Sequence, residues 1–325
     1  GPTLPKCRLC VEIAAPPGMP GAAPTGRHRA LQRARRRGGL RRSDARTRQQ
    51  MQVRSLGYRT DLLFPTFDGE VLARRGYLAV RTPSNPGFYW GNFLLYARPP
   101  GEGDVARWRE DFRREIGCPP DVKHETFGWD SPEGDLGCVE PFLREGFCVS
   151  RSVVLTRREP PAPDSPPPGI EARILVSDSD WQQAVACQVA CRDQGFDEQA
   201  YRDFRTRSMA RYRRMADAGR GGWFGAFSGD RLVADLGVFH GGGLGRYQSV
   251  ETQPEFRRRG IAGYLVRVAG HHAMVEHRLH SLVIVAEEAS DAARLYHALG
   301  FRHAEAQVGL ERWPEMDPGD AAEAG

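Results

Sequence analysis

The stretch that decides the fold is Val250-Glu251-Thr252-Gln253-Pro254-Glu255-Phe256-Arg257-Arg258-Arg259-Gly260-Ile261-Ala262-Gly263. The pattern predicts a strand over residues 246–252, a short loop, and an amphipathic helix from Arg259. The first N–H groups of a helix have no intrahelical partner and lie at the positive end of its dipole. Small residues at Gly260 and Ala262 let an anion approach those groups, and the arginines add charge-assisted hydrogen bonds. We therefore expect a diphosphate to bind here.

Working outward, residues 170–313 alternate between strand and helix patterns. Strands are expected at 170–175, 223–227, 232–240, 246–252, 282–286 and 307–313, and helices at 180–192, 197–215, from 259, and at 291–299. The helix from Arg259 is expected to bury Ile261, Leu265, Val268 and Val275. The continuous apolar run Leu282–Ala286 is typical of a strand covered on both faces. These elements predict an α/β domain.

At these residues the chain resembles the GNAT superfamily of acyl-CoA-dependent N-acyltransferases. Arg257, Gly260 and Ala262 match the family's diphosphate motif, Gln/Arg-x-x-Gly-x-Gly/Ala. The run Leu295-Tyr296-His297-Ala298-Leu299-Gly300-Phe301 matches the family's helix ending in Leu-Tyr…Leu-Gly-Phe. The family often has Asn seven residues before the Tyr, where this chain has Ala289. The resemblance covers about residues 170–313 and implies the GNAT fold, a mixed central sheet flanked by helices.

The resemblance also implies the donor site. Acetyl-CoA, as the acyl-donor substrate, would lie in a V between strands 246–252 and 282–286, its pantetheine arm pairing with the edge of the former strand. N–H groups near Val250 would polarise the thioester carbonyl. The expected binding residues are Val250, Thr252, Arg257, Arg258, Arg259, Gly260, Ile261 and Ala262.

Catalysis by such a site needs a base for the amine and an acid for the departing thiolate. Tyr296 is the expected acid, because the family often uses this Tyr and phenol and thiol pKa values are close. The alternative is that its ring only packs beside the cofactor. Glu251, on the catalytic strand, is the expected base if strand alternation points it into the cleft, with Glu287 and His240 as alternatives.

Residues 51–158 are interpreted as a second α/β domain, N-terminal to residues 170–313. Strands are expected there at 77–81, 88–97, 122–129 and 148–156, and helices at 103–116 and 139–145. The order and the ending Phe142-Leu143-Arg144-Glu145-Gly146-Phe147 suggest a tandem GNAT with a degenerate N-terminal copy; the alternative is an unrelated accessory domain. Pro99-Pro100-Gly101-Glu102-Gly103 replaces the arginine loop, so this copy is expected to bind no CoA. The Pro-rich residues 159–169 predict a linker.

Charge is concentrated at the N-terminus. Residues 1–50 hold twelve Lys or Arg and two acids, which predicts a disordered basic tail, while the remaining chain is mildly acidic and a nucleic-acid-binding body is not implied. Residues 314–325 are expected to be a disordered C-terminal tail. The Cys7-x-x-Cys10 pair lacks a second pair at metal-site spacing, so no metal is expected.

Seven irregularly spaced cysteines favour a reducing, cytoplasmic compartment, and neither a membrane span nor a signal-peptide pattern is visible. The expected function is transfer of an acetyl group from acetyl-CoA to a primary amine of a small molecule or protein. The alternative is an acyl-CoA-binding sensor or interaction protein without turnover. The expected partners are the donor and an amine acceptor, with no membrane; nucleic acid, through residues 27–48, is the least favoured partner. The family resemblance places the acceptor side within residues 180–220, and the oligomeric state is not predicted.

Overall fold

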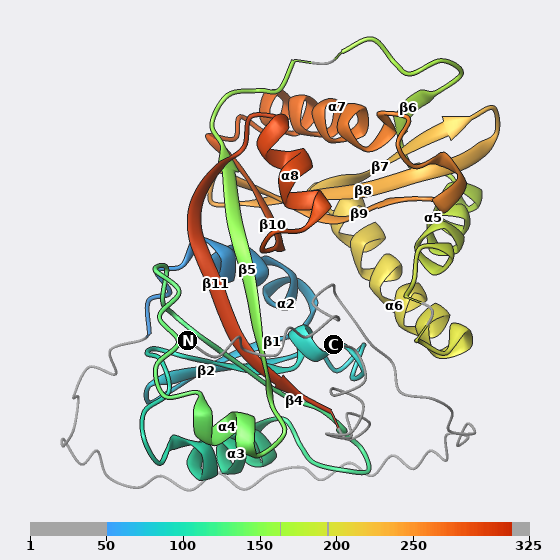
Figure 1. Cartoon of the computed structure of the whole chain (residues 1–325). Helices are drawn as coiled ribbons and strands as arrows, with labels where there is room; N and C mark the ends of the chain where they lie inside the picture. Colours follow the sequence, from blue (N-terminus) through green and yellow to red (C-terminus); the bar gives the residue numbers. More distant parts are fainter. Residues whose placement is uncertain (1–50, 163, 194, 314–325) are drawn as a thin grey trace, which may run out of the picture.

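The computed structural model describes residues 51–313 except residues 163 and 194 (Figure 1). The two predicted tails and the Cys7–Cys10 pair lie outside the described residues. The helices are α1 (Leu56–Asp61), α2 (Leu63–Asp68), η1 (Tyr89–Gly91), α3 (Asp104–Glu115), α4 (Glu140–Arg144), α5 (Asp178–Ala190), α6 (Glu198–Asp217), η2 (Pro254–Phe256), α7 (Ile261–Glu276) and α8 (Asp291–Ala298). The strands are β1 (Glu70–Arg74), β2 (Tyr77–Arg81), β3 (Phe93–Tyr96), β4 (Glu125–Trp129), β5 (Cys148–Arg157), β6 (Glu171–Ile174), β7 (Gly221–Ser228), β8 (Arg231–Gly241), β9 (Leu244–Thr252), β10 (Ser281–Glu287) and β11 (Arg302–Arg312).

All described strands form one mixed sheet in the order β1-β2-β3-β4-β11-β5-β10-β9-β8-β7-β6. Two neighbouring pairs are parallel, β3 with β4 and β9 with β10, and the other pairs are antiparallel. From each edge inward the strands follow their order in the sequence, β1 to β4 on one side and β6 to β10 on the other. On both sides the last of these neighbouring pairs is parallel, and β11 and β5 lie between the two sides. The predicted α/β class with a mixed sheet flanked by helices is confirmed.

The two central strands join the halves of the molecule. β5 lies beside β10, and β11 lies beside β4, so each half receives the last strand of the other. Figure 1 shows these two strands running side by side from one half into the other. The sheet therefore runs across the predicted boundary at residues 159–169, and the division into two domains stays a prediction. We call residues 51–157 the N-half and residues 170–313 the C-half.

Three elements of the N-half were not predicted. Helices α1 and α2 and strand β1 are each five or six residues long, too short for a clear apolar period. The predicted strand over residues 88–97 is divided, because Tyr89–Gly91 form the 3-10 turn η1 before β3 begins. No helix among the described residues has both the length and the apolar character needed to cross a membrane.

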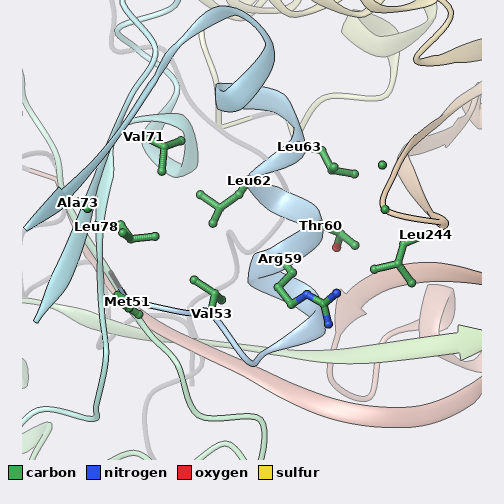
Figure 2. A pocket seen from close by; sticks show the side chains of 12 residues that line it. Met51, Val53, Arg59, Thr60, Leu62, Leu63, Val71, Ala73, Leu78 and Leu244 are labelled. Atoms are coloured by element: carbon green, nitrogen blue, oxygen red, sulfur yellow. The ribbon is translucent and has the colours of Figure 1, made fainter. Parts of the chain in front are cut away.

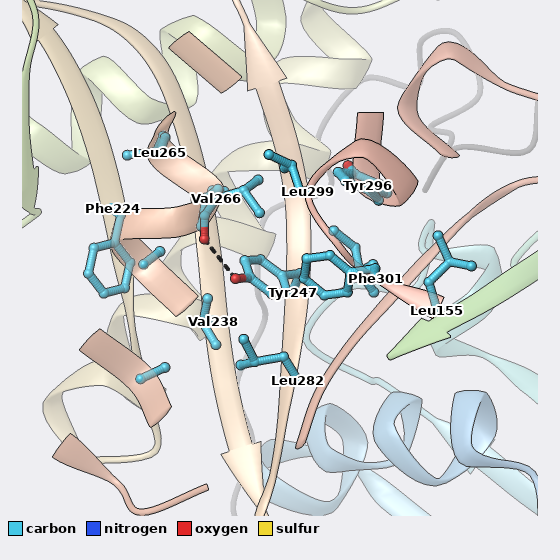
Figure 3. Close-up of a cluster of buried hydrophobic side chains, with 14 of the residues drawn as sticks. Leu155, Phe224, Val238, Tyr247, Leu265, Val266, Leu282, Tyr296, Leu299 and Phe301 are labelled. Carbon is cyan, nitrogen blue, oxygen red and sulfur yellow. Dashed lines mark hydrogen bonds between the residues drawn. The ribbon is translucent and has the colours of Figure 1, made fainter. Parts of the chain in front are cut away.

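One face of the C-half sheet packs against α7 and α8 (Figure 3). Leu265 and Val266 of α7 are fully buried, and burial of each such side chain contributes roughly 1.5–3 kcal/mol. Tyr247 Oη of β9 donates to the Val266 carbonyl at 2.7 Å, which fixes the helix over the strand. The prediction that Val275 is buried was wrong: it is 52% exposed, because it lies in the last turn on the solvent side.

The other face of that sheet packs against α5 and α6, and the N-half helix α2 joins them. The Phe64 ring lies edge-on to Tyr212 of α6 at 5.7 Å and to Phe239 of β8 at 5.8 Å. Two arginines of α6 also lie on this buried face. Arg205 and Arg211 are buried, and Arg211 Nε lies 2.7 Å from the Asp68 carboxylate at the end of α2.

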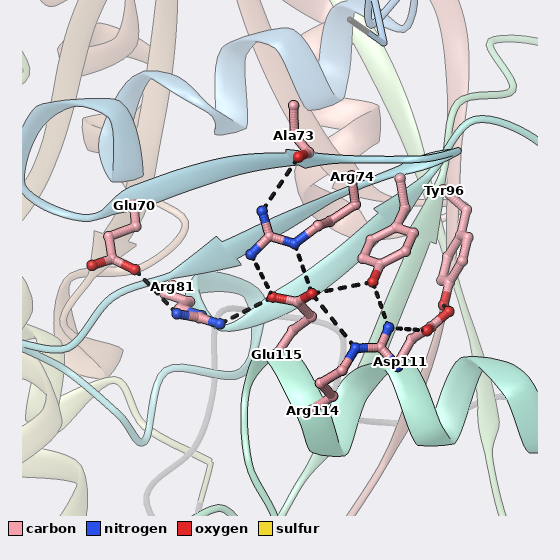
Figure 4. Close-up of polar contacts among 9 residues, drawn as sticks. Glu70, Ala73, Arg74, Arg81, Tyr96, Asp111, Arg114 and Glu115 are labelled. Carbon is pink, nitrogen blue, oxygen red and sulfur yellow. Dashed lines mark hydrogen bonds and ion pairs between the residues drawn. The ribbon is translucent and has the colours of Figure 1, made fainter. Parts of the chain in front are cut away.

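A buried carboxylate fastens α3 to the outer strands of the N-half (Figure 4). Glu115 accepts hydrogen bonds from Arg74 at 2.7 and 2.8 Å and from Arg81 at 3.0 Å. The hydrogen bond from Arg74 lowers the pKa of Glu115. This network is a structural clamp that ties β1 and β2 to the helix.

Candidate active site at the opening between β9 and β10

The sheet opens between β9 and β10. The two parallel strands pair only where residues 244–246 face residues 281–283. Beyond that point β9 continues beside β8 and β10 continues beside β5. The strands therefore diverge in the V that the family resemblance implies, and the edge of β9 that faces the opening has no paired strand among the described residues past Arg246.

A β-bulge lies in β9 at the mouth of this opening. The register passes from Gln248 opposite Gly237 to Glu251 opposite Asp235, so Ser249 and Val250 together oppose one residue. Ser249 has φ 46°, and its carbonyl accepts from Gln188 Nε2 of α5 at 3.2 Å. This bulge holds the backbone near Val250 in a conformation that a regular strand does not have.

The bulge decides where Glu251 points. Because Glu251 is opposite Asp235, the two side chains share one face of the sheet. Asp235 accepts from Gln188 of α5 at 2.5 Å, so that face is the one covered by α5 and α6. Glu251 is half-buried there and lines a cavity.

The cavity has a volume of about 370 Å³ and lies at the opening of the sheet. Four of the residues considered from the sequence line it: Val250, Glu251, Glu287 and Tyr296. His240 is not among them, since it pairs with Gly245 at the far end of β9 and its ring lies 4.1 Å from that of His277. His240 is therefore in the wrong place to be the base.

Tyr296 lies on α8 with 5% of its surface exposed. Burial raises the pKa of its phenol, and the negative charge of Glu251 raises that pKa further. The side chain therefore stays protonated throughout the physiological range and can donate a hydrogen bond into the cavity. The same shift makes it a weaker acid than the sequence argument assumed from ordinary pKa values.

The predicted diphosphate residues lie outside the cavity, at the start of α7. Gly260 is the N-cap with φ 76°, and a Cβ built on it would meet no described atom within 4 Å. The first turn carries the uncharged Ile261, Ala262 and Gly263, so no carboxylate of this turn competes for its N–H groups. The arrangement fits an incoming anion.

The three arginines before this helix are exposed, and two are held by backbone carbonyls. Arg257 Nε donates to the Thr252 carbonyl at 3.0 Å, and Arg259 Nη2 donates to the Glu255 carbonyl at 2.8 Å. Arg258 has φ 61°, in the left-handed region. These contacts keep Arg257 and Arg259 near the start of α7.

The start of α8 shows why the missing Asn matters. Ala289, at the position where the family often has Asn, has φ 64°. Asn adopts this left-handed conformation more readily than Ala does. Ser290 follows as N-cap, and its side chain accepts from the Ala293 amide at 3.1 Å.

Much of the cavity wall comes from residues that sequence reasoning missed. The N-half contributes Tyr58, Asp61, Phe64, Phe88 and Trp90, and β11 contributes Glu311. The acceptor side was expected within residues 180–220, but the described residues of that range do not line the cavity. They support it from behind, as Gln188 does at the bulge. No local pattern marks the N-half residues, because they meet the C-half from positions far away in the sequence.

A second hollow of about 380 Å³ lies between α1, β1, β2 and the turn after β8 (Figure 2). Its wall is largely apolar, with Leu62, Leu63 and Leu244 among its residues, and Arg59 is the ionisable side chain among the described residues that line it. It shares no residue with the first cavity and offers no acid–base pair.

Comparison with known proteins agrees with this architecture. Residues 224–309 match the family model described as FR47-like protein. A functionally unknown conserved protein from Staphylococcus epidermidis is similar with a TM-score of 0.59 at 13% identity, over 76% of this chain and 94% of that one. A GCN5-related N-acetyltransferase from Kribbella flavida gives 0.57 at 14% identity, over 82% and 99%. One from Sphaerobacter thermophilus gives 0.53 at 17% identity, over 79% and 87%. No curated protein matched the chain.

Proposed function

We propose that this chain is a member of the GNAT superfamily and transfers an acetyl group from acetyl-CoA to a primary amine. The observation that carries the proposal is the opening between β9 and β10 beside the start of α7. A donor that combines an extended arm with a diphosphate would use both features, the strand edge for the arm and the helix terminus for the diphosphate.

The donor would be held by the residues that the sequence singled out. Arg257, Arg258 and Arg259 would pair with the diphosphate, and the N–H groups of Ile261 and Ala262 would receive its oxygens. The edge of β9, including Val250 and Thr252, would pair with the pantetheine arm. The backbone at the Val250 bulge would then be the group that polarises the thioester carbonyl.

Two side chains of the cavity would carry the proton transfers. Glu251 would take one proton from the ammonium form of the acceptor, directly or through a water, so that the neutral nitrogen attacks the thioester carbonyl. The carbon–sulfur bond breaks as the amide forms, and the nitrogen gives up a second proton, which replaces the proton that Tyr296 donates. Tyr296 would then donate its hydroxyl proton, or a hydrogen bond, to the departing sulfur. Because burial keeps its pKa high, Tyr296 enters this step protonated.

The test is an assay of acetyl transfer and free thiol release from acetyl-CoA against a panel of primary amines, with two matched variants. Gly260→Glu places bulk and negative charge at the expected diphosphate, and kcat/KM for acetyl-CoA should fall at least about 100-fold, a loss of ~3 kcal/mol. Gly103→Glu makes the same change at the start of α3, where the backbone has nearly the same φ, and should leave kcat/KM unchanged.

The outcomes separate the two function classes. Transfer to an amine, lost in Gly260→Glu and kept in Gly103→Glu, supports the enzyme. Binding of acetyl-CoA without transfer to any amine of the panel would replace the enzyme with a sensor. Equal activity of the two variants would remove α7 from the donor site.

A further inference from the structure

Two buried polar side chains hold one residue of the β9 bulge. Gln188 of α5 and Arg205 of α6 are 0% and 1% exposed. Gln188 Nε2 donates to the Ser249 carbonyl at 3.2 Å, and Arg205 Nη1 donates to the Ser249 hydroxyl at 3.2 Å. Ser249 is therefore fixed through its main chain and through its side chain, by two different helices.

The bulge needs such support because its backbone conformation is unfavourable. Ser249 has φ 46°, in the left-handed region that residues other than glycine rarely adopt. Such a conformation persists only where the surrounding structure imposes it. The next residue, Val250, lines the cavity, and the N–H groups near it are the ones that would polarise the thioester carbonyl. A change in the backbone at Ser249 would therefore turn those N–H groups away from the donor.

The two supporting side chains are themselves held in place. Asp235 of β8 accepts from the same Gln188 Nε2 at 2.5 Å. Arg205 Nε donates to Tyr201 Oη at 2.9 Å, and the guanidinium carbon lies 5.2 Å from the centroids of the Tyr201 and Phe204 rings. Burial raises the pKa of Asp235, and the charge of Arg205 partly offsets that rise. The guanidinium is thus a rigid donor within the packed face of the sheet, and a donor locked by its neighbours fixes its acceptor closely.

Resting on the proposed function, we propose that Arg205, together with Gln188, is a positioning residue of the active site. It acts through Ser249, whose fixed conformation aims the N–H groups of the bulge at the thioester carbonyl of the donor. Arg205 itself touches neither substrate, since the described residues of α6 do not line the cavity. The family resemblance placed the acceptor side in the range of α5 and α6, whereas these contacts connect the two helices to the donor.

The first measurement compares two donors that differ at the carbonyl group, acetyl-CoA and its thioether analogue S-ethyl-CoA. Calorimetry on the full chain needs neither an acceptor nor turnover. We expect acetyl-CoA to bind at least about fivefold more tightly, because only its carbonyl oxygen can accept from the bulge. In Ser249→Ala and in Arg205→Met this preference should fall below about twofold. The affinity for S-ethyl-CoA should stay unchanged, because the start of α7 is the same in all chains.

A double-mutant cycle on turnover tests whether Arg205 acts through Ser249. We expect kcat to fall at least about tenfold in each single variant, with less than about a threefold change in the KM for acetyl-CoA. The variant that carries both Arg205→Met and Ser249→Ala should be no slower than Arg205→Met alone, because the second change removes a contact that the first has already removed. Ser249→Ala deletes one hydroxyl and keeps the test decisive if Arg205→Met does not fold.

Arg211→Met is the matched control. Arg211 also lies on α6, is 4% exposed, and its Nε lies 2.7 Å from the Asp68 carboxylate rather than at the bulge. Its variant should lower the melting temperature, as Arg205→Met does. It should nevertheless keep the preference for acetyl-CoA, and its kcat should stay within about twofold of the unmodified chain.

An unchanged preference for acetyl-CoA in Arg205→Met and Ser249→Ala would overturn the proposal. Equal binding of the two donors to the unmodified chain would do the same, and so would an equal loss in Arg211→Met. If the preference changes as expected but no amine is acetylated, the proposed function fails while the positioning role stands. If amines are acetylated and the two changes are additive, the proposed function stands and the positioning role fails. Binding of neither donor would overturn both.

Discussion

Helices α3 and α7 begin on nearly the same backbone and differ in what their first turns hold. Their N-cap glycines, Gly103 and Gly260, have φ 77° and 76° with ψ 0° in both. At α3 the next residue is Asp104, whose carboxylate accepts from the Gly101 amide at 2.9 Å. That carboxylate also lies 3.0 Å from Arg98. At α7 the corresponding residue is the uncharged Ile261. The N-half helix thus places its own carboxylate where the C-half helix offers room for an external anion.

The strands before these helices, β3 and β9, also differ, in how far each is paired with its parallel neighbour. β3 pairs with β4 up to its last residue, Tyr96, whereas β9 runs on for six residues after its pairing with β10 ends at Arg246. The Tyr96 ring stacks on Trp108 of α3 with centroids 3.8 Å apart. An aromatic core thus occupies the N-half where the C-half has its opening. In the proposed function the C-half would hold the donor, while the N-half supplies strand β5 and part of the cavity wall.

The largest effect should come from removing the N-half, because we expect the C-half not to fold alone. Residues 170–313 lack β5, so β10 and β11 each lose their central partner. Unpaired inner strands and an uncovered core should abolish the fold. We expect residues 170–313 to be insoluble or to give a collapsed amide spectrum by NMR, while residues 51–313 give a dispersed one. A dispersed spectrum from the shorter chain, with acetyl-CoA binding, would show that the exchanged strand is dispensable.

The next largest effect should come from one hydroxyl. Tyr296 and Phe142 occupy matching places in the two halves. The carbonyl of each accepts a hydrogen bond from the backbone N–H of the Phe five residues later, and the residue before that Phe is a glycine with positive φ. Tyr296→Phe therefore gives the C-half the residue that the N-half already has. If proton or hydrogen-bond donation contributes, kcat should fall ~10²–10⁴-fold with little change in the KM for acetyl-CoA.

The pH profile provides an independent check on Tyr296. Since burial raises its pKa, kcat should show no loss from its ionisation up to about pH 10, the ordinary phenol range. A Phe variant within about threefold of the unmodified chain, with chemistry rate-limiting, would leave only the packing role.

A smaller effect should appear in the pH dependence of stability, through a buried histidine of the N-half. His124 in the N-half is 2% exposed, and burial lowers its pKa to about 4. The unfolded chain binds a proton near pH 6.5, so this histidine's contribution is complete above pH 6.5 and is lost as the pH falls towards 4. Between pH 7 and 5 the free energy of unfolding should fall by ~2 kcal/mol from His124 alone.

Chemical denaturation of the unmodified chain and of His124→Gln at pH 7 and pH 5 measures how much His124 contributes to the change in the free energy of unfolding. The variant should lose less stability than the unmodified chain over that range. Burial also lowers the pKa values of His240 and His277 in the C-half, but these two contribute equally to both chains. The same pH slope in both chains would contradict the assignment to His124.

The smallest effect should come from the residue before α8 in the C-half. Ala289→Asn introduces the residue that the family often carries, at φ 64°, where Asn is less strained than Ala. The free energy of unfolding should rise by ~0.5–1 kcal/mol. Ala298→Asn on the exposed face of α8 is the control and should destabilise, because Asn is a poorer helix former. A loss of stability in Ala289→Asn would show that the backbone there does not favour Asn.

The C-half could be predicted from sequence because its signals are local. The strand, the arginines and the glycine that opens α7 are consecutive, and the Leu-Tyr…Leu-Gly-Phe ending lies within α8. Predicted cleft residues such as Val250, Glu251 and Tyr296 duly line one cavity. Their chemical roles stay predictions, as does the absence of CoA binding in the N-half.

The remaining features depend on distant partners. β5 and β11 have ordinary strand patterns, and nothing in either pattern tells which half it will join. The burial of Arg211 follows from Asp68 on α2, which no helical period of α6 reveals. The aromatic side chains of the cavity wall likewise depend on α2 and η1 reaching the C-half. Long-range pairing, rather than local propensity, sets these features.

The most direct test of the difference between the two halves is the stoichiometry of acetyl-CoA binding to the full chain by isothermal titration calorimetry. One helix start is open and the other holds its own carboxylate, so the account predicts one molecule per chain. Two molecules per chain would show that the N-half also binds the donor, and no binding would contradict the donor site at α7.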